Sequence, residues 1–270
     1  MDKFNLFNRE DTFMKLRKMT FLILMGVLLI TLVACRNGDD DTENPTEPVP
    51  SESTEQIEQT PSADALAFKA EHEELNGLAH PDVPDAIMKD MYVQENNPFR
   101  YAQYDEIIEL LEGGTGIIYF GFPICPWCRN LVPVLTDAAI DFGVEDILYR
   151  NVLEDRNILN LEDGQIVEVR AGHPGYYQVL EILGNLAPEY RGLEDESIRR
   201  IFVPAVVFVK DGAVISYFQN LSTFQDRVND EADEVTAWDS MNSDEIQELR
   251  QIFMNYFEIL FGDECGITSC

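Results

Sequence analysis

The sequence predicts an α/β domain in which a mixed central sheet is covered by helices. The first observation is an apolar run over residues 116–122, followed by a helical pattern from Pro126 and a second strand-like segment over residues 146–152. A strand, a helix and a further strand in this order imply a parallel pair joined by a crossover. The second observation is Asp211-Gly212, a tight-turn dipeptide between two apolar segments, which predicts an antiparallel hairpin.

In chain order, the first predicted element is a helix over residues 63–78, and a plausible strand over residues 86–93 follows it. A second helix is predicted over residues 104–112, because apolar residues recur there at helical spacing before a glycine stop at 113–114.

The middle of the chain supplies the crossover unit. Residues 116–122 are rich in β-branched and aromatic side chains, which is typical of a buried strand. A helix over residues 126–142 and a strand over residues 146–152 follow. Residues 154–200 are charged and are predicted to form a partly helical insertion, whose best helix is 176–186.

The last third supplies the hairpin and the closing helix. Strands are predicted over residues 205–210 and 213–218. Residues 220–241 form an acidic connection, after which Asn242 or Ser243 caps a final amphipathic helix.

The N-terminal segment is predicted to be an export signal rather than part of the fold. Basic residues precede an uncharged apolar stretch over residues 20–34, which is shorter than the roughly 20 residues of a bilayer-spanning helix. The stretch ends Leu-Val-Ala-Cys at Cys35, which resembles the lipobox of bacterial lipoproteins. The resemblance implies that residues 1–34 are removed and that Cys35 becomes a lipidated N-terminus. A plain membrane anchor with an incidental cysteine is the alternative, and a start at Met14 would give a more usual signal length.

Residues 35–62 are predicted to be a disordered acidic tether, because they contain many Pro, Ser, Thr, Asp and Glu residues and almost nothing apolar. The folded domain then spans residues 63–270. The lipid anchor would hold it at the extracytoplasmic face of the bacterial cell membrane, where disulfides persist.

The charge balance limits the partners. The chain has 50 Asp+Glu against 19 Lys+Arg, which gives a net charge of −31. This balance argues against nucleic acid, whose binding requires cations that neutralise phosphates. It argues equally against electrostatic docking on anionic lipid.

The residues that carry chemistry lie where the first buried strand meets its helix: Cys125-Pro126-Trp127-Cys128. Cys125 is expected at the helix N-terminus, where free backbone N–H groups and the helix dipole favour a thiolate. Pro126 suits the first helical turn because it has no N–H to lose, and Arg129 adds positive charge nearby. Cys125 can attack a partner disulfide, and Cys128, one turn away, can resolve the mixed disulfide.

These residues resemble the thioredoxin superfamily. Pro133 stands where the family often carries a helix-kinking proline, and Val203-Pro204 precedes the predicted strand at 205 as the family's cis-proline loop does. The resemblance covers roughly residues 86–261. The lipobox and the phrase YFGFPICPWCRN are most similar to thioredoxin-like lipoproteins of Gram-positive bacteria, including bacteriocin transport accessory proteins.

The resemblance implies a thioredoxin-like fold with a helical insertion before the cis-proline strand. It also implies that Pro204 is cis and that Val203 and Pro204 hold an extended substrate against the cysteine pair. We expect Trp127 at the surface, where it and Pro126 would contact a docked partner. One departure is Tyr119, which stands where many thioredoxins carry a buried carboxylate that relays protons.

Other uses of the cysteines remain open. Cys125 and Cys128 could form a purely structural disulfide, or could bind zinc together with Cys265 and Cys270. Cys265 and Cys270 are the candidate structural disulfide, with a second redox pair as the alternative. The acidic stretch over residues 226–244 lacks the spacing of an EF-hand calcium loop.

The function predicted from these features is thiol–disulfide exchange on exported or cell-surface proteins, with Cys125 as nucleophile and Cys128 as resolving cysteine. No metal or organic cofactor is implied, and a membrane protein could supply or remove electrons. The alternative is a non-catalytic surface lipoprotein that uses the fold as a binding scaffold. Oxidase, reductase and isomerase activities stay open, because all three use the same two cysteines.

Overall fold

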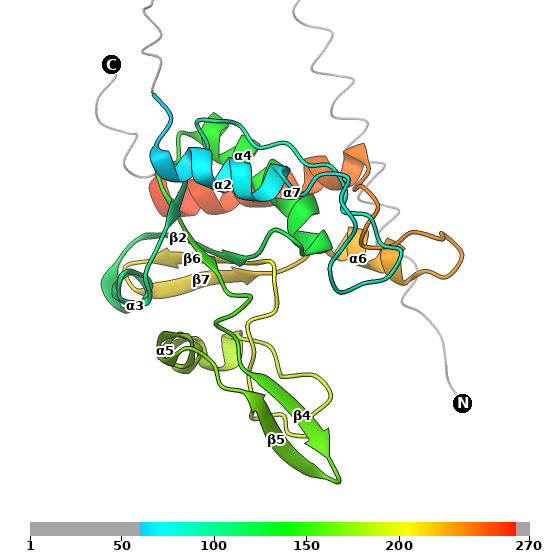
Figure 1. The fold of residues 1–270 in the computed structure, drawn as a ribbon. Coiled ribbons are helices and arrows are strands. Elements are labelled where there is room, and N and C mark those ends of the chain that lie inside the picture. Colours follow the sequence, from blue (N-terminus) through cyan, green and yellow to red (C-terminus); the bar gives the residue numbers. More distant parts are fainter. Residues whose placement is uncertain (1–59, 263–270) are drawn as a thin grey trace, which may run out of the picture. The chain divides into compact units, whose positions relative to one another are not determined.

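A five-stranded mixed sheet forms the centre of the protein in the computed structural model, which describes residues 60–262 (Figure 1). The strands are β1 (Phe99–Tyr101), β2 (Gly116–Gly121), β3 (Ile147–Asn151), β6 (Ala205–Lys210) and β7 (Ala213–Phe218). Their order is β1-β3-β2-β6-β7. β1 and β2 each pair in parallel with β3, whereas β6 pairs antiparallel with both β2 and β7. The predicted α/β fold with a mixed central sheet is confirmed.

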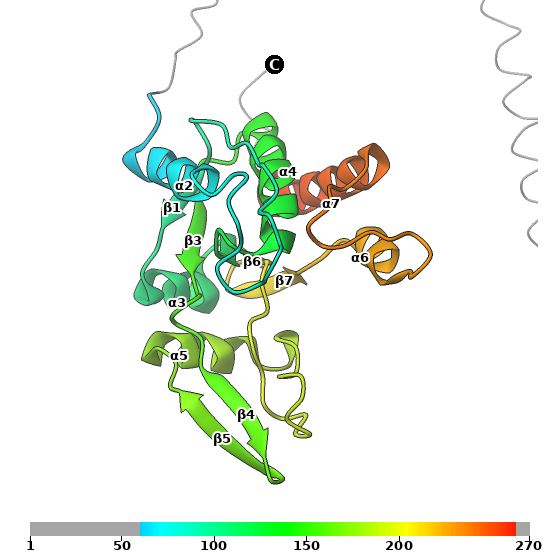
Figure 2. The same ribbon diagram turned by 45° about the vertical axis from the view of Figure 1, so that its right-hand side comes forward.

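Helices cover both faces of this sheet (Figures 1 and 2). On one face α4 (Pro126–Phe142) packs against α7 (Ser243–Phe261), and α2 (Ala63–Glu73) lies against β1. On the other face lies α3 (Tyr104–Gly113), with α5 (Pro174–Leu183) beyond it. Since both faces are covered, β2 and β6 are buried almost from end to end, as their continuous apolar sequences predict.

The predicted strand over residues 86–93 is wrong. Only an isolated bridge between Ala79 and Ile87 forms there. The Asn76 side chain instead donates to the Met91 carbonyl (2.9 Å) and accepts from the Met91 N–H (3.1 Å). The Asn76 side chain thus occupies the N–H and the carbonyl of Met91, which a neighbouring strand would otherwise bind. The edge strand of the sheet, β1, forms further along the chain.

The insertion is partly helical, as predicted, but it begins with a β-hairpin that was not predicted. β4 (Ile158–Glu162) and β5 (Gln165–Arg170) form a separate two-stranded sheet that extends away from the central sheet (Figure 2). Asp163 and Gly164 make its turn with φ values of 49° and 75°, the left-handed pair that a two-residue hairpin favours. α5 and the short 3-10 helix η1 (Gly184–Leu186) follow.

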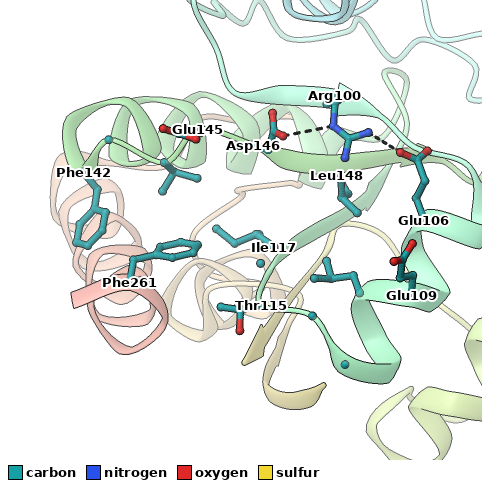
Figure 3. A pocket seen from close by; sticks show the side chains of 16 residues that line it. Arg100, Glu106, Glu109, Thr115, Ile117, Phe142, Glu145, Asp146, Leu148 and Phe261 are labelled. Atoms are coloured by element: carbon teal, nitrogen blue, oxygen red, sulfur yellow. Dashed lines mark hydrogen bonds and ion pairs between the residues drawn. The ribbon is translucent and has the colours of Figure 1, made fainter. Parts of the chain in front are cut away.

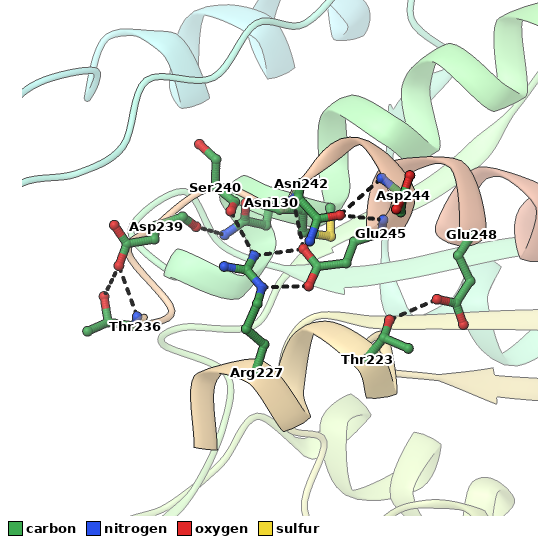
Figure 4. A network of polar contacts seen from close by, with 11 residues as sticks. Asn130, Thr223, Arg227, Thr236, Asp239, Ser240, Asn242, Asp244, Glu245 and Glu248 are labelled. Atoms are coloured by element: carbon green, nitrogen blue, oxygen red, sulfur yellow. Dashed lines mark hydrogen bonds and ion pairs between the residues drawn. The ribbon is translucent and has the colours of Figure 1, made fainter. Parts of the chain in front are cut away.

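The acidic connection before the last helix contains α6 (Ser222–Asn229), which was not predicted. Arg227 of α6 forms an ion pair with Glu245 in the first turn of α7, at 2.7 Å (Figure 4). Glu245 and Asn242 also form a reciprocal cap at the start of α7. The Asn130 side chain donates to the Asp239 carbonyl at 2.9 Å, so the connection is fastened to α4 near the cysteines.

Several predictions fall on residues outside the described range. These are the signal peptide, the lipidated Cys35, the tether up to residue 59, and the Cys265–Cys270 pair. Within residues 60–262, no helix combines the length and the apolar character needed to cross a bilayer.

A buried histidine couples the fold to pH. His72 lies on α2 with its side chain fully buried and its ring 4.1 Å from that of Phe68. Its Nδ1 lies 2.8 Å from the Phe68 carbonyl oxygen, whereas its buried Nε2 has no hydrogen-bond partner in the described part of the chain. Burial lowers the pKa of His72 from its ordinary value of 6.5 to about 4.

We predict that His72 makes the protein less stable in mild acid. A pKa lowered by folding gives stability that is complete above pH 6.5 and is lost as the pH falls towards 4, because only the unfolded chain takes up the proton. The expected contribution is about 3 kcal/mol of unfolding free energy lost between pH 7 and pH 4. Urea unfolding at both pH values should show a correspondingly smaller loss for His72→Phe. Equal losses in the two proteins would contradict the prediction.

Candidate redox site

The cysteine pair lies at the junction of β2 and α4. Cys125 is the N-cap residue of α4, and its Sγ accepts the Cys128 N–H at 3.3 Å. Both cysteines are free thiols. Cys125 is 5% exposed, whereas Cys128 is completely buried. A partner sulfur approaching from solvent therefore meets Cys125 first.

A loop from much later in the chain lies against this pair. The Val203–Pro204 peptide bond is cis, and the Cys125 thiol donates to the Val203 carbonyl at 3.7 Å. Pro204 is buried at the start of β6, while Val203 is half-buried. Because β6 pairs with β2, the sheet itself brings this loop to the end of β2 from which the cysteines extend.

The two residues between the cysteines are both half-buried. Pro126 occupies the first turn of α4. The Trp127 ring makes an edge-on contact with the Phe224 ring of α6, at 5.3 Å between centroids. One side of the Trp127 ring, which we expected to contact a docked partner, is therefore packed against α6, a helix that the sequence did not predict.

Arg129 does not have the expected role of a charge beside the thiols. It is completely buried, and its guanidinium donates to the carbonyls of Lys89 (2.6 Å), His72 (3.0 Å) and Pro123 (3.1 Å). A further donor contacts the Asn76 side-chain oxygen. These oxygens belong to the N-terminal segment and to the loop before Cys125, so Arg129 acts as a structural clamp.

The surroundings of the two thiols move their pKa values in opposite directions. Burial raises the pKa of Cys125 well above its ordinary value, and its contact with Cys128 adds to the effect. Burial also opposes ionisation of Cys128, but hydrogen bonding from Cys125 and Tyr119 and the charge of Arg156 outweigh it and lower its pKa. These directions favour the negative charge on Cys128, and the expectation of a thiolate at Cys125 stays a prediction.

Tyr119 is the polar group that β2 places closest to the buried sulfur. Its side chain is completely buried, and its ring stacks on that of Tyr149 at 5.5 Å. A Cβ at Gly121 would lie 2.1 Å from the Tyr119 hydroxyl oxygen, so this placement requires a glycine. The hydroxyl has no hydrogen-bond partner of regular geometry among residues 60–262, and a thiolate at Cys128 would supply an acceptor.

Sequence reasoning missed Arg156, which lies in the insertion and whose guanidinium stacks over the Phe122 ring at 4.9 Å. No motif marks this residue. Its nearness to the cysteines depends on how the segment after β3 folds back on the end of β2.

A hollow of about 1030 Å³ lies at the opposite end of β2 and contains no cysteine (Figure 3). Apolar side chains such as Ile117 and Phe261 line it, and at its rim Arg100 bridges Glu106 (2.6 Å) and Asp146 (3.4 Å). No group of three or more His, Cys, Asp or Glu side chains converges to hold a metal within residues 60–262. The cysteine pair, rather than this hollow, is therefore the candidate site.

Comparison with protein-family models, with curated proteins and with solved structures finds no match to this chain. The resemblance of the CxxC segment and the Val203-Pro204 loop to the thioredoxin superfamily therefore stays a prediction from the sequence.

We predict that Tyr119→Phe weakens ionisation of the cysteine pair. Hydrogen bonds to charged groups contribute about 1.5–3 kcal/mol, so the ionisation constant of the more acidic thiol should fall about tenfold. The measurement is the ultraviolet absorbance of the thiolate as a function of pH. Tyr217→Phe is the matched control, because Tyr217 also carries a buried hydroxyl without a partner in the described chain. Identical titrations of wild type and Tyr119→Phe would refute the role of the hydroxyl.

Proposed function

We propose that this protein is a thioredoxin-like thiol–disulfide oxidoreductase that acts on exported proteins. The observation that carries the proposal is the contact between the Cys125 thiol and the Val203 carbonyl, at 3.7 Å, directly before cis-Pro204. A CxxC pair at the start of a helix, next to such a loop, has the geometry needed to place a partner's sulfur against Cys125. The order of strands and helices around the pair supports the same proposal.

The chemistry is a two-step exchange. In the reducing direction Cys125, the thiol nearer to solvent, loses its proton and attacks a partner disulfide, and one partner sulfur leaves as a thiolate. Cys128 then attacks the Cys125 sulfur and releases the second partner sulfur. The pair ends as a disulfide and the partner has gained two electrons and two protons; the reverse sequence oxidises a partner dithiol. Burial of Cys128 suits it for the second step, because only the adjacent mixed disulfide can reach it.

The proposed location is the outer face of the cytoplasmic membrane. The lipobox-like sequence that ends at Cys35 supports it, and so does a redox function, because disulfides form and persist outside the cytoplasm. Residues 36–62 would then give the domain reach from the lipid surface.

We predict that both cysteines of the pair are required, in different ways. Cys125→Ser should reduce the rate of insulin reduction by a small dithiol to that of the uncatalysed reaction, because the attacking sulfur is lost. Cys128→Ser should accumulate mixed disulfides with partners, visible on non-reducing gels, because they are no longer resolved.

The matched control is Cys265→Ser/Cys270→Ser, which removes two cysteines and leaves the pair intact. It should keep wild-type activity. Full activity of the Cys125→Ser variant would contradict the proposed mechanism. A wild-type pair that resists mild reductants would instead favour the non-catalytic binding scaffold.

We predict that Cys35 is the lipidated residue. In a Gram-positive host, the wild-type chain should incorporate labelled palmitate and sediment with membranes, and Cys35→Ala should do neither. Cys125→Ser serves as the control for cysteine loss and should still be labelled. Equal labelling of the Cys35→Ala chain would rule out this anchor.

A further inference from the structure

Arg156 is held over the loop that carries the cysteines. Its backbone N–H donates to the Val152 carbonyl (3.2 Å), and the Val152 N–H donates to the Gly121 carbonyl at the end of β2 (3.3 Å). Its guanidinium lies 4.9 Å from the centroid of the Phe122 ring. The Phe122 carbonyl in turn accepts the Cys125 N–H at 3.2 Å. Three backbone hydrogen bonds and the contact with the Phe122 ring therefore connect this cation to the loop that carries the cysteine pair.

This cation has no carboxylate partner within residues 60–262. The Nε atom of Arg156 is buried without a hydrogen bond. Neighbouring carboxylates are engaged elsewhere: Asp155 pairs with Arg150 (2.7 Å) and Glu154 with Arg170 (2.6 Å). In a chain with 50 acidic and 19 basic residues, a partly buried arginine without a carboxylate is unexpected. A buried polar group without a partner costs free energy and calls for an explanation.

Three ionisable groups would stabilise the Arg156 charge as anions: Tyr176, whose own pKa burial raises, and the two thiols. Burial lowers the pKa of Arg156, and the charge of Arg200 lowers it further, whereas negative charge on Cys125 or Cys128 acts in the opposite direction. Conversely, the charge of Arg156 helps lower the pKa of Cys128. Reduction of the pair thus gives the unpaired cation an anion that the disulfide form does not provide.

We infer that Arg156 is a positioning residue that stabilises the Cys128 thiolate and thereby poises the pair as an oxidant of partner dithiols. The inference rests on the proposed function and gives it a direction. It parallels the general rule that a redox pair is a stronger oxidant when its reduced form is stabilised.

The oxidising turnover balances with the partner dithiol as the only reductant. A partner thiolate attacks the Cys125 sulfur, the Cys125–Cys128 bond breaks, and its electron pair remains on Cys128 as a thiolate beside Arg156. The second partner thiolate then attacks the partner sulfur of the mixed disulfide and expels Cys125, which takes up a proton. The partner loses two electrons and two protons; one proton ends on Cys125 and the other enters solvent.

The test is the reduction potential of the pair in a glutathione series, measured on the full chain in a Cys265→Ser/Cys270→Ser background so that Cys125 and Cys128 alone titrate. Arg156→Met should make the pair harder to reduce by about tenfold in its equilibrium constant with glutathione, which corresponds to about 30 mV. Arg156→Lys keeps the charge and should remain within about threefold of wild type. The thiolate titration should shift in parallel, with a smaller ionisation constant in Arg156→Met only.

Arg250→Met is the matched control, because it removes one positive charge from an arginine that pairs with Asp141 (2.8 Å) on the helices away from the loop. Its potential should equal that of wild type. If Arg156→Met does not fold, as judged by urea unfolding, Arg156→Gln replaces it and should give the same shift.

Different results would contradict the proposed function and the role of Arg156. A wild-type pair that never titrates with glutathione would overturn the proposed function and this inference with it. A wild-type pair that titrates normally, with an unchanged or more oxidising potential in the neutral Arg156 variants, would overturn the role of Arg156 alone. An equal shift in Arg156→Lys would also overturn it, because the charge would then be irrelevant.

Discussion

The buried guanidinium of Arg129 is the interaction on which the surroundings of the cysteine pair depend. It donates to carbonyls of three separate segments, at His72 in α2, at Lys89 in the irregular segment that follows, and at Pro123 just before Cys125. A buried cation is tolerated only when acceptors satisfy its donors. One side chain therefore fixes the N-terminal segment, the loop before the cysteines and the first turn of α4 to one another.

Arg129 and Arg156 are both arginines with buried guanidinium atoms, but their surroundings differ. Arg129 is surrounded by oxygen acceptors, so its charge is satisfied in the fold. Arg156 has an aromatic ring and two thiols near it and leaves its buried Nε unpaired, as Tyr119 leaves its hydroxyl. Unsatisfied polar groups of this kind are concentrated at functional sites. Here both groups act on the pKa of Cys128, which they lower.

The insertion between β3 and β6 contributes to the site at both of its ends. Near its start it places Arg156 over Phe122, and beyond its end the chain passes through Val203 to cis-Pro204. Internal hydrogen bonds join these ends, since the Tyr176 hydroxyl accepts the Ile201 N–H (3.1 Å) and Arg200 donates to the Asn157 carbonyl (3.0 Å). The hairpin β4–β5 can therefore extend outward, while these hydrogen bonds fix the two ends of the insertion next to the cysteine pair.

The sequence by itself determined the elements with strong local signals. The continuous apolar runs of β2 and β6, the Asp211-Gly212 turn and the Asn242 cap of α7 each specify their element through nearby residues, as does the position of Cys125 at the start of α4. The Asp163-Gly164 turn of β4–β5 carries the same kind of local signal. Only the tertiary structure decided that residues 86–93 form no strand, with the Met91 backbone bound to the Asn76 side chain, and that the three-residue β1 is the edge. It also decided that Arg129 is a clamp, that Arg156 lies over the Phe122 ring and that the pKa values of the two thiols move in opposite directions. Hydrogen-bond partners and desolvation depend on segments brought together from distant parts of the chain, and no local pattern records them.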